Sequence, residues 1–596
     1  MKPYYIFIFC FVSITITSVI IVPSLIDDAL LPRFITITTF LTLFTCVFFS
    51  TISKQLWKQI GLIDMLFLLF FGIHIISICW AQNTAEAIFS TTKIGVFVLL
   101  YLFFKWLLFQ YKEKAITSII WSIFCLALLL GIIASYQLYQ VHLEVGWDRF
   151  TVKPVTGRSG NKNLLSGLLF TCIPLLLLGV FRLKRKINWI YILLAFLLTY
   201  LVYQIRTRSV YLAIAVCITM VLLYYAYWYY KYRWLKVMFP ILSILLATTC
   251  VIFFLGYSQD ISEVLSLREG SKTGTIAERF TIWNKSIVLF KENVVIGVGA
   301  GNWKIAFPSI GLEDLTRAEQ TTTFFARAHN DWIQILCETG IIGGLIWMSI
   351  WVTTIWRSSI TLGTAILKKQ AIPLIIVLSG LLGYGLFTLV SYPLERIEFI
   401  IFLSLYFALL SYYTHAPNKT VPFSKLTSKI STFLIILFLG ISSIYGVLRM
   451  KQESLVLEIP KTQSNTIFTS ENYRPTIYSI TPTGTPIKYY EGSYHLQKSN
   501  YKKAIKAFQE ALTVAPNDLP THLNIGVSYY RSSYIDKALY HYKKALKISP
   551  KHQDVLFNTA AVYYKRRDKK KTLEFLRKVQ DDYPRKKEFL EAVLKL

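Results

Sequence analysis

Apolar runs of about 20 residues recur from the N-terminus to about residue 447, and no other feature of this sequence constrains its fold as strongly. A helix of that length crosses the ~30 Å hydrocarbon core of a bilayer, because each helical residue advances the chain by ~1.5 Å. A helix also satisfies its own backbone hydrogen bonds, which lipid cannot do. The sequence therefore predicts an all-α fold that begins with a polytopic transmembrane helical bundle.

About thirteen spans are expected. They cover residues 4–24, 34–50, 61–80, 92–110, 116–138, 163–181, 188–204, 209–230, 236–256, 332–356, 371–390, 396–413 and 430–447. Residues 1–21 are interpreted as the first helix and not as a signal peptide, because they lack a small-residue cleavage site and further apolar runs follow.

The formal net charge of +30 raises the question of a nucleic-acid partner. A nucleic-acid surface needs Lys and Arg in one stripe interleaved with aromatic side chains. Here the positive residues gather in alternate short loops and in the C-terminal region. Positive loops face the cytoplasm in membrane proteins, so we expect a membrane partner and no nucleic acid. The N-terminus is then cytoplasmic, and the loop 257–331 and everything after residue 447 lie on the opposite side.

A 34-residue repeat follows the bundle. Gly492, Ala504, Phe508, Ala511 and Pro516 recur as Gly526, Ala538, Tyr542, Ala545 and Pro550, and a weaker third copy supplies Ala560, Val579 and Pro584. This period resembles the tetratricopeptide repeat, whose helix pairs stack into an α-solenoid that binds a protein partner. We therefore expect a membrane domain at 1–447, a linker rich in Pro, Thr and Ser at 448–484, and a repeat domain at 485–596.

The cysteines and the outer loops point away from metal chemistry. All eight cysteines fall inside apolar runs, so the sequence holds neither a disulfide framework nor a thiolate cluster. The outer loops carry no pattern of metal ligands. We expect no metal and no cofactor.

Four polar segments meet at the outer face: 157–163, 206–209, 278–283 and 327–331. Charge beside hydrocarbon is costly and marks a functional site. Arg206 and Arg208 share a short outer turn, where they either reach lipid phosphates or form a planar fork for a pyrophosphate. Arg279 and Arg327 could close the same cluster, although Arg279 also fits an ordinary helix-surface charge.

His329 is the histidine that lies in an outer-loop motif of this kind. An imidazole with a pKa of ~6.5 suits proton transfer near neutral pH. Asn330 and Asp331 are close enough in the sequence either to orient His329 or to cap the helix that follows.

At these positions the sequence resembles the O-antigen ligase and polymerase superfamily over roughly residues 60–415. The matching elements are Gly160–Asn161–Lys162–Asn163, Thr207–Arg208–Ser209, Arg279 with Trp283, residues 297–302, and His329–Asn330–Asp331 with Glu338–Thr339–Gly340. The resemblance implies a metal-independent inverting transferase. In it, Arg208 and Arg279 hold the undecaprenyl-pyrophosphate of the donor, and His329 is the base on the acceptor hydroxyl.

Further residues join these three in the expected site. Arg206, beside the family position, is expected to bind substrate together with Arg327, Asn161, Asn163 and Asp331. A thirteenth span and the repeats go beyond the usual ligase pattern and leave the acceptor open.

The leading function is transfer of a glycan from undecaprenyl pyrophosphate to a lipid A core. This implies a bacterial inner-membrane protein with periplasmic repeats. A polymerase acting on another lipid-linked repeat and a protein O-oligosaccharyltransferase stay as alternatives. A non-enzymatic carrier is a further alternative, but it would need polar residues threaded through several spans, and the spans are almost wholly apolar.

Overall fold

The computed structural model describes residues 1–145, 155–183, 188–230, 275–313, 315, 325–364, 368–414, 424–462 and 474–595. The described residues are 80% helix, and they form no strand beyond an isolated bridge between Ile480 and Pro486. The expected all-α fold, with apolar helices followed by helical repeats, is therefore confirmed.

The helices of the bundle coincide with the apolar runs of the sequence. They are α1 (Pro3–Cys10), the π-helix η1 (Phe11–Ile16), α2 (Thr17–Val19), α3 (Leu30–Val47), α4 (Phe49–Gln55), η2 (Leu56–Gln59), α5 (Leu62–Ser77), α6 (Thr84–Tyr111), α7 (Glu113–Val145), α8 (Lys162–Arg182), α9 (Asn188–Ile205), α10 (Arg208–Tyr230), α16 (Asp331–Thr364), α17 (Lys368–Thr388), η5 (Pro393–Glu395), α18 (Ile397–Tyr413) and α19 (Lys425–Thr462).

The expected count of thirteen spans is not confirmed. Eight described helices are long and apolar enough to cross a membrane, and four further apolar helices are shorter: Pro3–Val19, Leu62–Ser77, Arg208–Tyr224 and Ile397–Tyr413. The expected span 236–256 lies outside the described residues. The protein is thus a multi-pass membrane protein.

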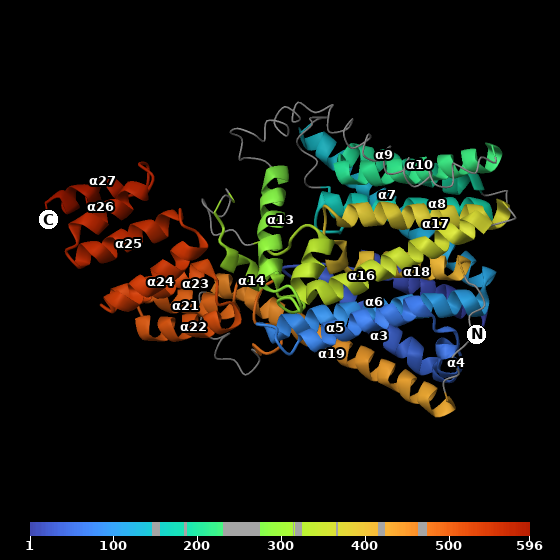
Figure 1. The fold of residues 1–596 in the computed structure, drawn as a ribbon, viewed down its shortest axis with the longest axis horizontal. Coiled ribbons are helices and arrows are strands. Elements are labelled where there is room, and N and C mark those ends of the chain that lie inside the picture. The colour runs from blue at the N-terminus through green and yellow to red at the C-terminus, as the bar shows by residue number, and fades with distance from the viewer. Residues whose placement is uncertain are drawn as a thin grey trace.

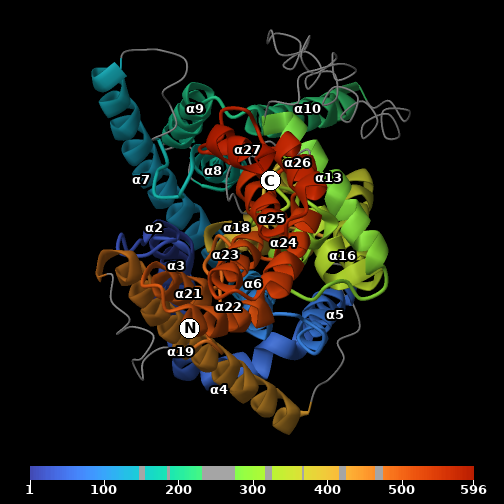
Figure 2. The same cartoon turned by 90° about the vertical axis from the view of Figure 1, so that its left-hand side faces the viewer.

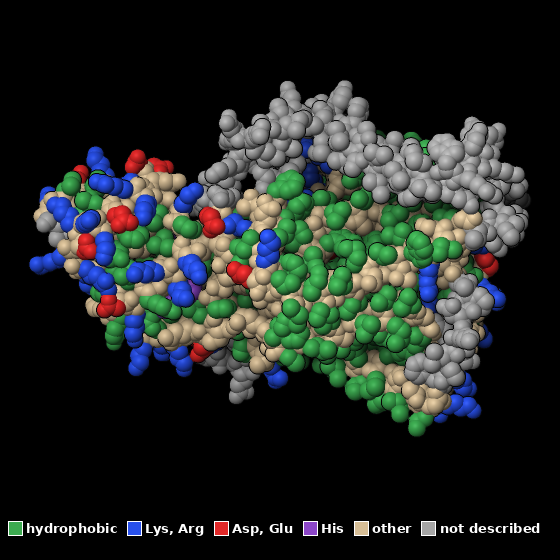
Figure 3. All heavy atoms as spheres, in the orientation of Figure 1, with side chains coloured by type: hydrophobic (Ala, Val, Ile, Leu, Met, Phe, Trp, Pro, Cys, Tyr) green, Lys and Arg blue, Asp and Glu red, His purple; other side chains and the backbone are tan. Residues whose placement is uncertain are grey.

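The centre of the bundle is formed by α6 and α18, which pack along each other. Both are buried over almost their whole length, as expected for helices that are apolar on all sides. Around them α3 packs along α19, α8 along α9, and α10 along α17. Large apolar side chains are exposed on the outer helices, and they cover the side of the bundle in Figure 3. That surface fits contact with lipid.

One end of the bundle carries the loop that was expected outside the cytoplasm. Its helix α13 (Thr275–Glu292) lies across this end, transverse to the long helices (Figure 1). A glycine-rich segment, α14 (Trp303–Ala306) and the 3-10 helix η4 (Phe307–Ile310) follow it. The glycine-rich segment is bonded to α16, with Val298 N–H donating to Cys337 O at 2.8 Å.

Gly340 lets this segment approach α16 closely. Its φ of +65° breaks the helical path of α16, and a Cβ atom there would lie 2.3 Å from Val295 O. A left-handed φ at such close contact requires glycine. The motif residue Gly340 therefore has a structural task, which is to seat the loop on α16.

The repeats form seven helices beyond the loop. They are α21 (Ile487–Gln497), α22 (Tyr501–Val514), α23 (Leu519–Arg531), α24 (Ile535–Ile548), α25 (Gln553–Lys565), α26 (Lys569–Lys578) and α27 (Lys586–Leu594). Small residues allow the paired helices to cross: a Cβ on Gly492 would lie 2.5 Å from the Phe508 ring, and one on Gly526 would lie 2.4 Å from the Tyr542 ring. The 34-residue period in the sequence records these crossings.

The repeats pack on the end of the bundle that carries α13 (Figures 1 and 2). Leu312 N–H donates to Ile548 O at 2.5 Å, and both side chains belong to one apolar cluster with Trp303 and Phe307. The loop and the repeats therefore lie at the same end of the bundle. Because α19 runs unbroken to Thr462, its last turns lie in the segment expected to be a linker, and the domain boundaries stay predictions.

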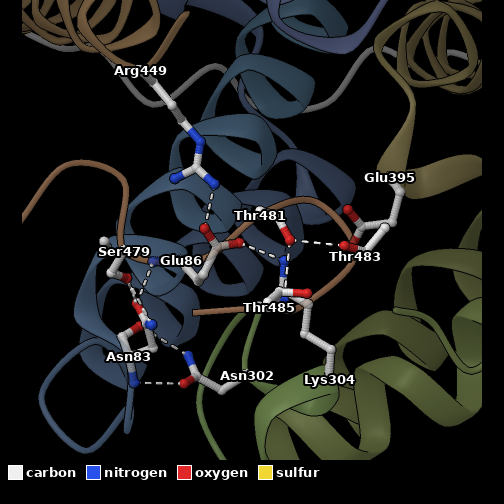
Figure 4. Close-up of polar contacts among 12 residues, drawn as sticks. Asn83, Glu86, Asn302, Lys304, Glu395, Arg449, Ser479, Thr481, Thr483 and Thr485 are labelled. Atoms are coloured by element: carbon white, nitrogen blue, oxygen red, sulfur yellow. Dashed lines mark hydrogen bonds and ion pairs between the residues drawn. The ribbon is translucent and has the colours of Figure 1, made fainter. Parts of the chain in front are cut away.

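A buried polar cluster joins the repeats to the bundle (Figure 4). Glu86 forms ion pairs with Arg449 and, at 2.8 Å, with Lys304. Asn83 N–H donates to Asn302 Oδ1 at 2.7 Å, and the Asn83 amide donates to Ser479 Oγ at 2.9 Å. The cluster thus fastens together the start of α6, the glycine-rich loop, the end of α19 and the segment before the repeats.

The topology is tested by reporters that are active only outside the cytoplasm. We expect fusions at Ala300 and Lys595 to be active and a fusion at Arg182 to be inactive, because positive loops stay in the cytoplasm. A fusion at Lys595 that behaves like the one at Arg182 contradicts the expected side of the repeats.

The buried polar cluster around Glu86 is tested by the substitution Arg449→Gln. This change leaves Glu86 buried with Lys304 as its remaining cationic partner, so we expect the free energy of unfolding to fall by about 3 kcal/mol. The measurement is denaturation of the purified protein in detergent. The control is Lys578→Gln, which removes an ion pair with Glu574 whose side chains are 53% and 58% exposed, and should change stability by less than about 0.5 kcal/mol. Equal effects of the two variants argue against a special role of the buried pair.

Candidate active site

Tyr392, in the short turn between α17 and α18, is the meeting point of several predicted site residues. The amide of Asn161 donates to Tyr392 Oη at 3.0 Å. The ring of His329 lies edge-on to the Tyr392 ring, with 5.1 Å between centroids, and the guanidinium of Arg327 lies 4.9 Å from the same ring centroid. An aromatic ring holds a cation and an imidazole edge in defined places. Tyr392 therefore gathers Asn161, Arg327 and His329.

Arg279 reaches the same turn from α13. Its Nη1 donates to Val390 O at 3.0 Å. Burial lowers the pKa of Arg279, while the neighbouring Tyr392 and Glu278 act in the opposite direction. One turn further along α13, the indole of Trp283 donates to Ala328 O at 2.9 Å, next to His329. The pairing of Arg279 with Trp283 in the sequence thus places one side chain on the turn and the other on the histidine segment.

The backbone at His329 is held in an unusual conformation. His329 has a φ of +54°, a left-handed value that few non-glycine residues adopt. Asn330 Oδ1 accepts from the N–H groups of Trp332 and Ile333, at 3.0 and 3.1 Å, so Asn330 caps α16. Asp331 Oδ2 accepts from Leu394 N–H at 3.0 Å and so supports the turn that carries Tyr392. These two neighbours fix the segment that follows His329.

Arg206 and Arg208 lie in the turn between α9 and α10, with both side chains exposed. Between them Thr207 is buried, and its hydroxyl donates to Ser166 Oγ at 2.8 Å and contacts Asn163 Oδ1 at 3.5 Å. Asn163 belongs to the first turn of α8, the helix that Asn161 caps through Leu164 N–H at 2.9 Å. Thr207 therefore ties the arginine turn to the helix start that also contacts Tyr392.

A small polar cavity of about 40 Å³ lies next to Arg327. It is lined by charged side chains from distant parts of the chain: Asp27, Glu86, Lys93, Lys304, Arg327, Glu338, Glu395, Arg449 and Glu453. A cavity must measure at least ~10–15 Å³ to hold one water molecule, so this cavity has room for a few waters and not for a sugar. Among the site residues, Arg327 connects this cavity with the Tyr392 ring.

Glu395 is the carboxylate of the cavity closest in sequence to Tyr392. Burial acts to raise its pKa, but Lys93, at 2.5 Å, and Arg327 outweigh burial and lower the pKa to about 2. The amide of Gln334 donates to Glu395 at 3.2 Å and to Glu338 at 3.1 Å. Glu395 is therefore a charged partner for the cations of the cavity.

Tyr392 and Glu395 were not predicted from the sequence. A signal for them existed, because residues 391–396 form a short outer turn between two apolar runs and contain a tyrosine, a glutamate and an arginine. The same criterion had singled out Arg206 and Arg208. The pairing of Glu86 with Arg449 carried no such signal, since the two residues are 363 positions apart.

The arrangement combines positive charge with one imidazole. Arg279 and Arg327 contact the turn of Tyr392, which His329 also contacts. Arg206 and Arg208 lie on a second turn, which Thr207 joins to α8. Guanidinium groups bind oxyanions, and an imidazole accepts a proton near neutral pH. The site is therefore suited to hold an anionic group beside a general base.

Two models of known protein families match parts of the chain. A model of the O-antigen ligase family matches residues 193–348, and a model of the tetratricopeptide repeat matches residues 489–518. No curated protein matches the chain. Among solved structures, a chain of "Crystal structure of APC/C hetero-tetramer Cut9-Hcn1" is 14% identical over 86% of this chain and 90% of that chain, with a TM-score of 0.19. The resemblance inferred from the motifs is thus confirmed: part of the membrane region is similar to the O-antigen ligase family, and part of the C-terminal region is similar to the tetratricopeptide repeat.

Proposed function

We propose that this protein transfers a glycan from undecaprenyl pyrophosphate to an acceptor hydroxyl, with the lipid A core as the leading acceptor. The reaction takes place at the periplasmic face of a bacterial inner membrane. The observation that carries the proposal is the convergence of His329, Arg279, Arg327 and Asn161 on the turn of Tyr392. A departing pyrophosphate needs positive charge and an attacking hydroxyl needs a base, and one cluster offers both.

In the proposed mechanism the acceptor oxygen attacks the anomeric carbon of the donor sugar. His329 takes the proton of the hydroxyl as the new carbon–oxygen bond forms. The bond from the anomeric carbon to the phosphate oxygen breaks, and its electron pair leaves with undecaprenyl pyrophosphate. Attack from the face opposite the leaving group inverts the anomeric centre.

The arginines balance the charge of the pyrophosphate. Arg208 and Arg279 are assigned to this role, with Arg206 and Arg327 beside them. A guanidinium offers two parallel hydrogen bonds to a phosphate, and positioned donors of this kind commonly supply the largest part of catalysis. Balance by arginine is the reason that we propose a metal-independent transferase.

Transfer to a protein hydroxyl is the second candidate, and the docking of the repeats favours it. The repeats contact the loop directly through Leu312 and Ile548. A protein bound to the repeats would therefore stay near the end of the bundle that holds His329. Purified protein given a polyprenyl-pyrophosphate glycan together with lipid A core or candidate proteins separates the two acceptors.

Removing the base should have a different effect from removing the arginines. We expect His329→Ala to lower the transfer rate by ~10²–10⁴ with donor affinity near wild type, because a base acts only when the acceptor loses its proton. Arg208→Ala and Arg279→Ala should weaken donor binding as well as the rate, and lysine at either position should restore only part of both. Transfer kinetics with a defined donor measure these effects. Full turnover by His329→Ala on a natural acceptor would show that the base lies elsewhere.

Tyr392 should act through the position of its neighbours. Tyr392→Phe keeps the ring beside His329 and Arg327 and loses only the bond from Asn161, so we expect a loss of less than about tenfold in rate. Tyr392→Leu removes the ring and should cost ~10²-fold, as small displacements of catalytic groups do. The control is Tyr534→Leu, an exposed tyrosine of the repeats. Equal rates for Tyr392→Leu and wild type would contradict the gathering role of the ring.

A further inference from the structure

Two buried guanidinium groups lie beneath the loop that precedes α8. Arg33 is fully buried on α3, and Arg396, at the start of α18, is 4% exposed. Arg33 Nη2 donates to Arg158 O at 2.6 Å, and its Nη1 lies 2.5 Å from Glu398. Arg396 Nη1 donates to Asp27 at 2.6 Å and its Nε to Glu398 at 3.3 Å. These two cations and two carboxylates thus form a cluster without net charge beneath the loop.

Among the residues that the structure describes, one guanidinium nitrogen of this cluster has neither a hydrogen-bond acceptor nor an ion-pair partner. Arg396 Nη2 is buried and has no hydrogen-bond partner among the residues that the structure describes. The same holds for the hydroxyl of Ser159, a fully buried residue of the loop above. Native proteins leave few buried donors unpaired, so an unpaired one calls for an explanation, and a ligand that accepts from it is one such explanation.

The unpaired nitrogen of Arg396 lies next to Gly160. A Cβ atom built on Gly160 would lie 4.0 Å from Arg396 Nη2, and no other atom is recorded within that distance. Gly160 itself is exposed. The side of Gly160 that faces the arginine is consequently not filled by other protein atoms.

The start of α8 adds backbone donors at this place. α8 is 21 residues long, and Asn161 caps it by accepting from Leu164 N–H. The N–H groups of the first turn have no partner within the helix, and the helix dipole makes this end attractive to anions. Arg158 and Lys162 add two positive charges in the same loop. Glu398 Oε2 is also unpaired among the described residues, but its charge is balanced by Arg33 and Arg396.

We propose that Arg396 Nη2, Ser159 Oγ and the N-terminus of α8 form a phosphate-binding subsite, and that it holds one phosphate of the lipid-linked diphosphate donor. A tetrahedral oxyanion can accept from a guanidinium, a hydroxyl and backbone N–H groups together. The subsite adjoins the residues that Tyr392 gathers, because Asn161 caps α8 and also donates to Tyr392. The identity of the ligand rests on the proposed function, whereas the phosphate chemistry of the subsite does not.

Ser159→Ala gives a test that leaves folding intact, since the hydroxyl it removes has no partner among the described residues. Its matched control is Ser549→Ala, which removes another buried and unpaired hydroxyl from the repeats. We expect the Kd of farnesyl pyrophosphate, measured by calorimetry on the full chain in detergent, to rise about threefold to tenfold in Ser159→Ala. The Ser549→Ala control should bind as the wild type does.

Arg396→Lys keeps the charge and loses the planar fork, and should raise the Kd by about tenfold or more. A thermal melt shows whether this variant folds, and Ser159→Ala decides the matter if it does not. Wild-type affinity in Ser159→Ala and in folded Arg396→Lys would overturn the subsite.

A parallel titration with inorganic phosphate separates the two sources of the anion. Weak binding of inorganic phosphate beside tight binding of farnesyl pyrophosphate supports the donor assignment. Equal affinity for both, with the same dependence on Ser159 and Arg396, supports a phosphate subsite but overturns its assignment to the donor. Binding is measured without transfer, so wild-type protein that binds farnesyl pyrophosphate but transfers no glycan to any acceptor would refute the proposed function and leave the binding result standing.

Discussion

The ion pair of Glu86 with Arg449 is the contact on which the outer end of this protein depends. A carboxylate buried without a partner is strongly destabilising, so Glu86 fixes the positions of Arg449 and Lys304 around it. Arg449 belongs to α19, whose end leads to the repeats, and Lys304 belongs to the loop that follows the glycines. One carboxylate thereby sets the mutual position of three parts of the chain, and the loop that bears His329 is seated on that frame.

The sequence predicted what depends on local pattern. Apolar runs became helices, the 34-residue period became helix pairs, and Asn161 lies at the start of α8 as a helix cap. The four polar segments were expected at one face from the alternation of spans alone. The number of spans was not fixed in this way, because several apolar helices are short and residues 236–256 lie outside the described chain.

What the sequence could not supply are contacts between distant positions. Tyr392 lies 231 positions from Asn161, and Arg396 lies 369 positions from Asp27. Neither pair follows from spacing, charge pattern or helical period. A buried arginine also looks the same in a sequence whether all of its nitrogens are paired or one is left over. The site residues proposed from the motifs are therefore surrounded by partners that only the fold brings together.

The hydrogen bond between the repeats and the loop is made by backbone atoms, Leu312 N–H and Ile548 O. Nearly any amino acid at these two positions offers the same donor and acceptor, proline at 312 being the exception. Point substitutions can therefore accumulate on both sides without loss of this bond. A change in chain length is different, because one residue inserted in η4 or at the end of α24 shifts the donor or the acceptor out of reach. Across evolutionary time this junction should tolerate exchanges among apolar residues and resist insertions and deletions.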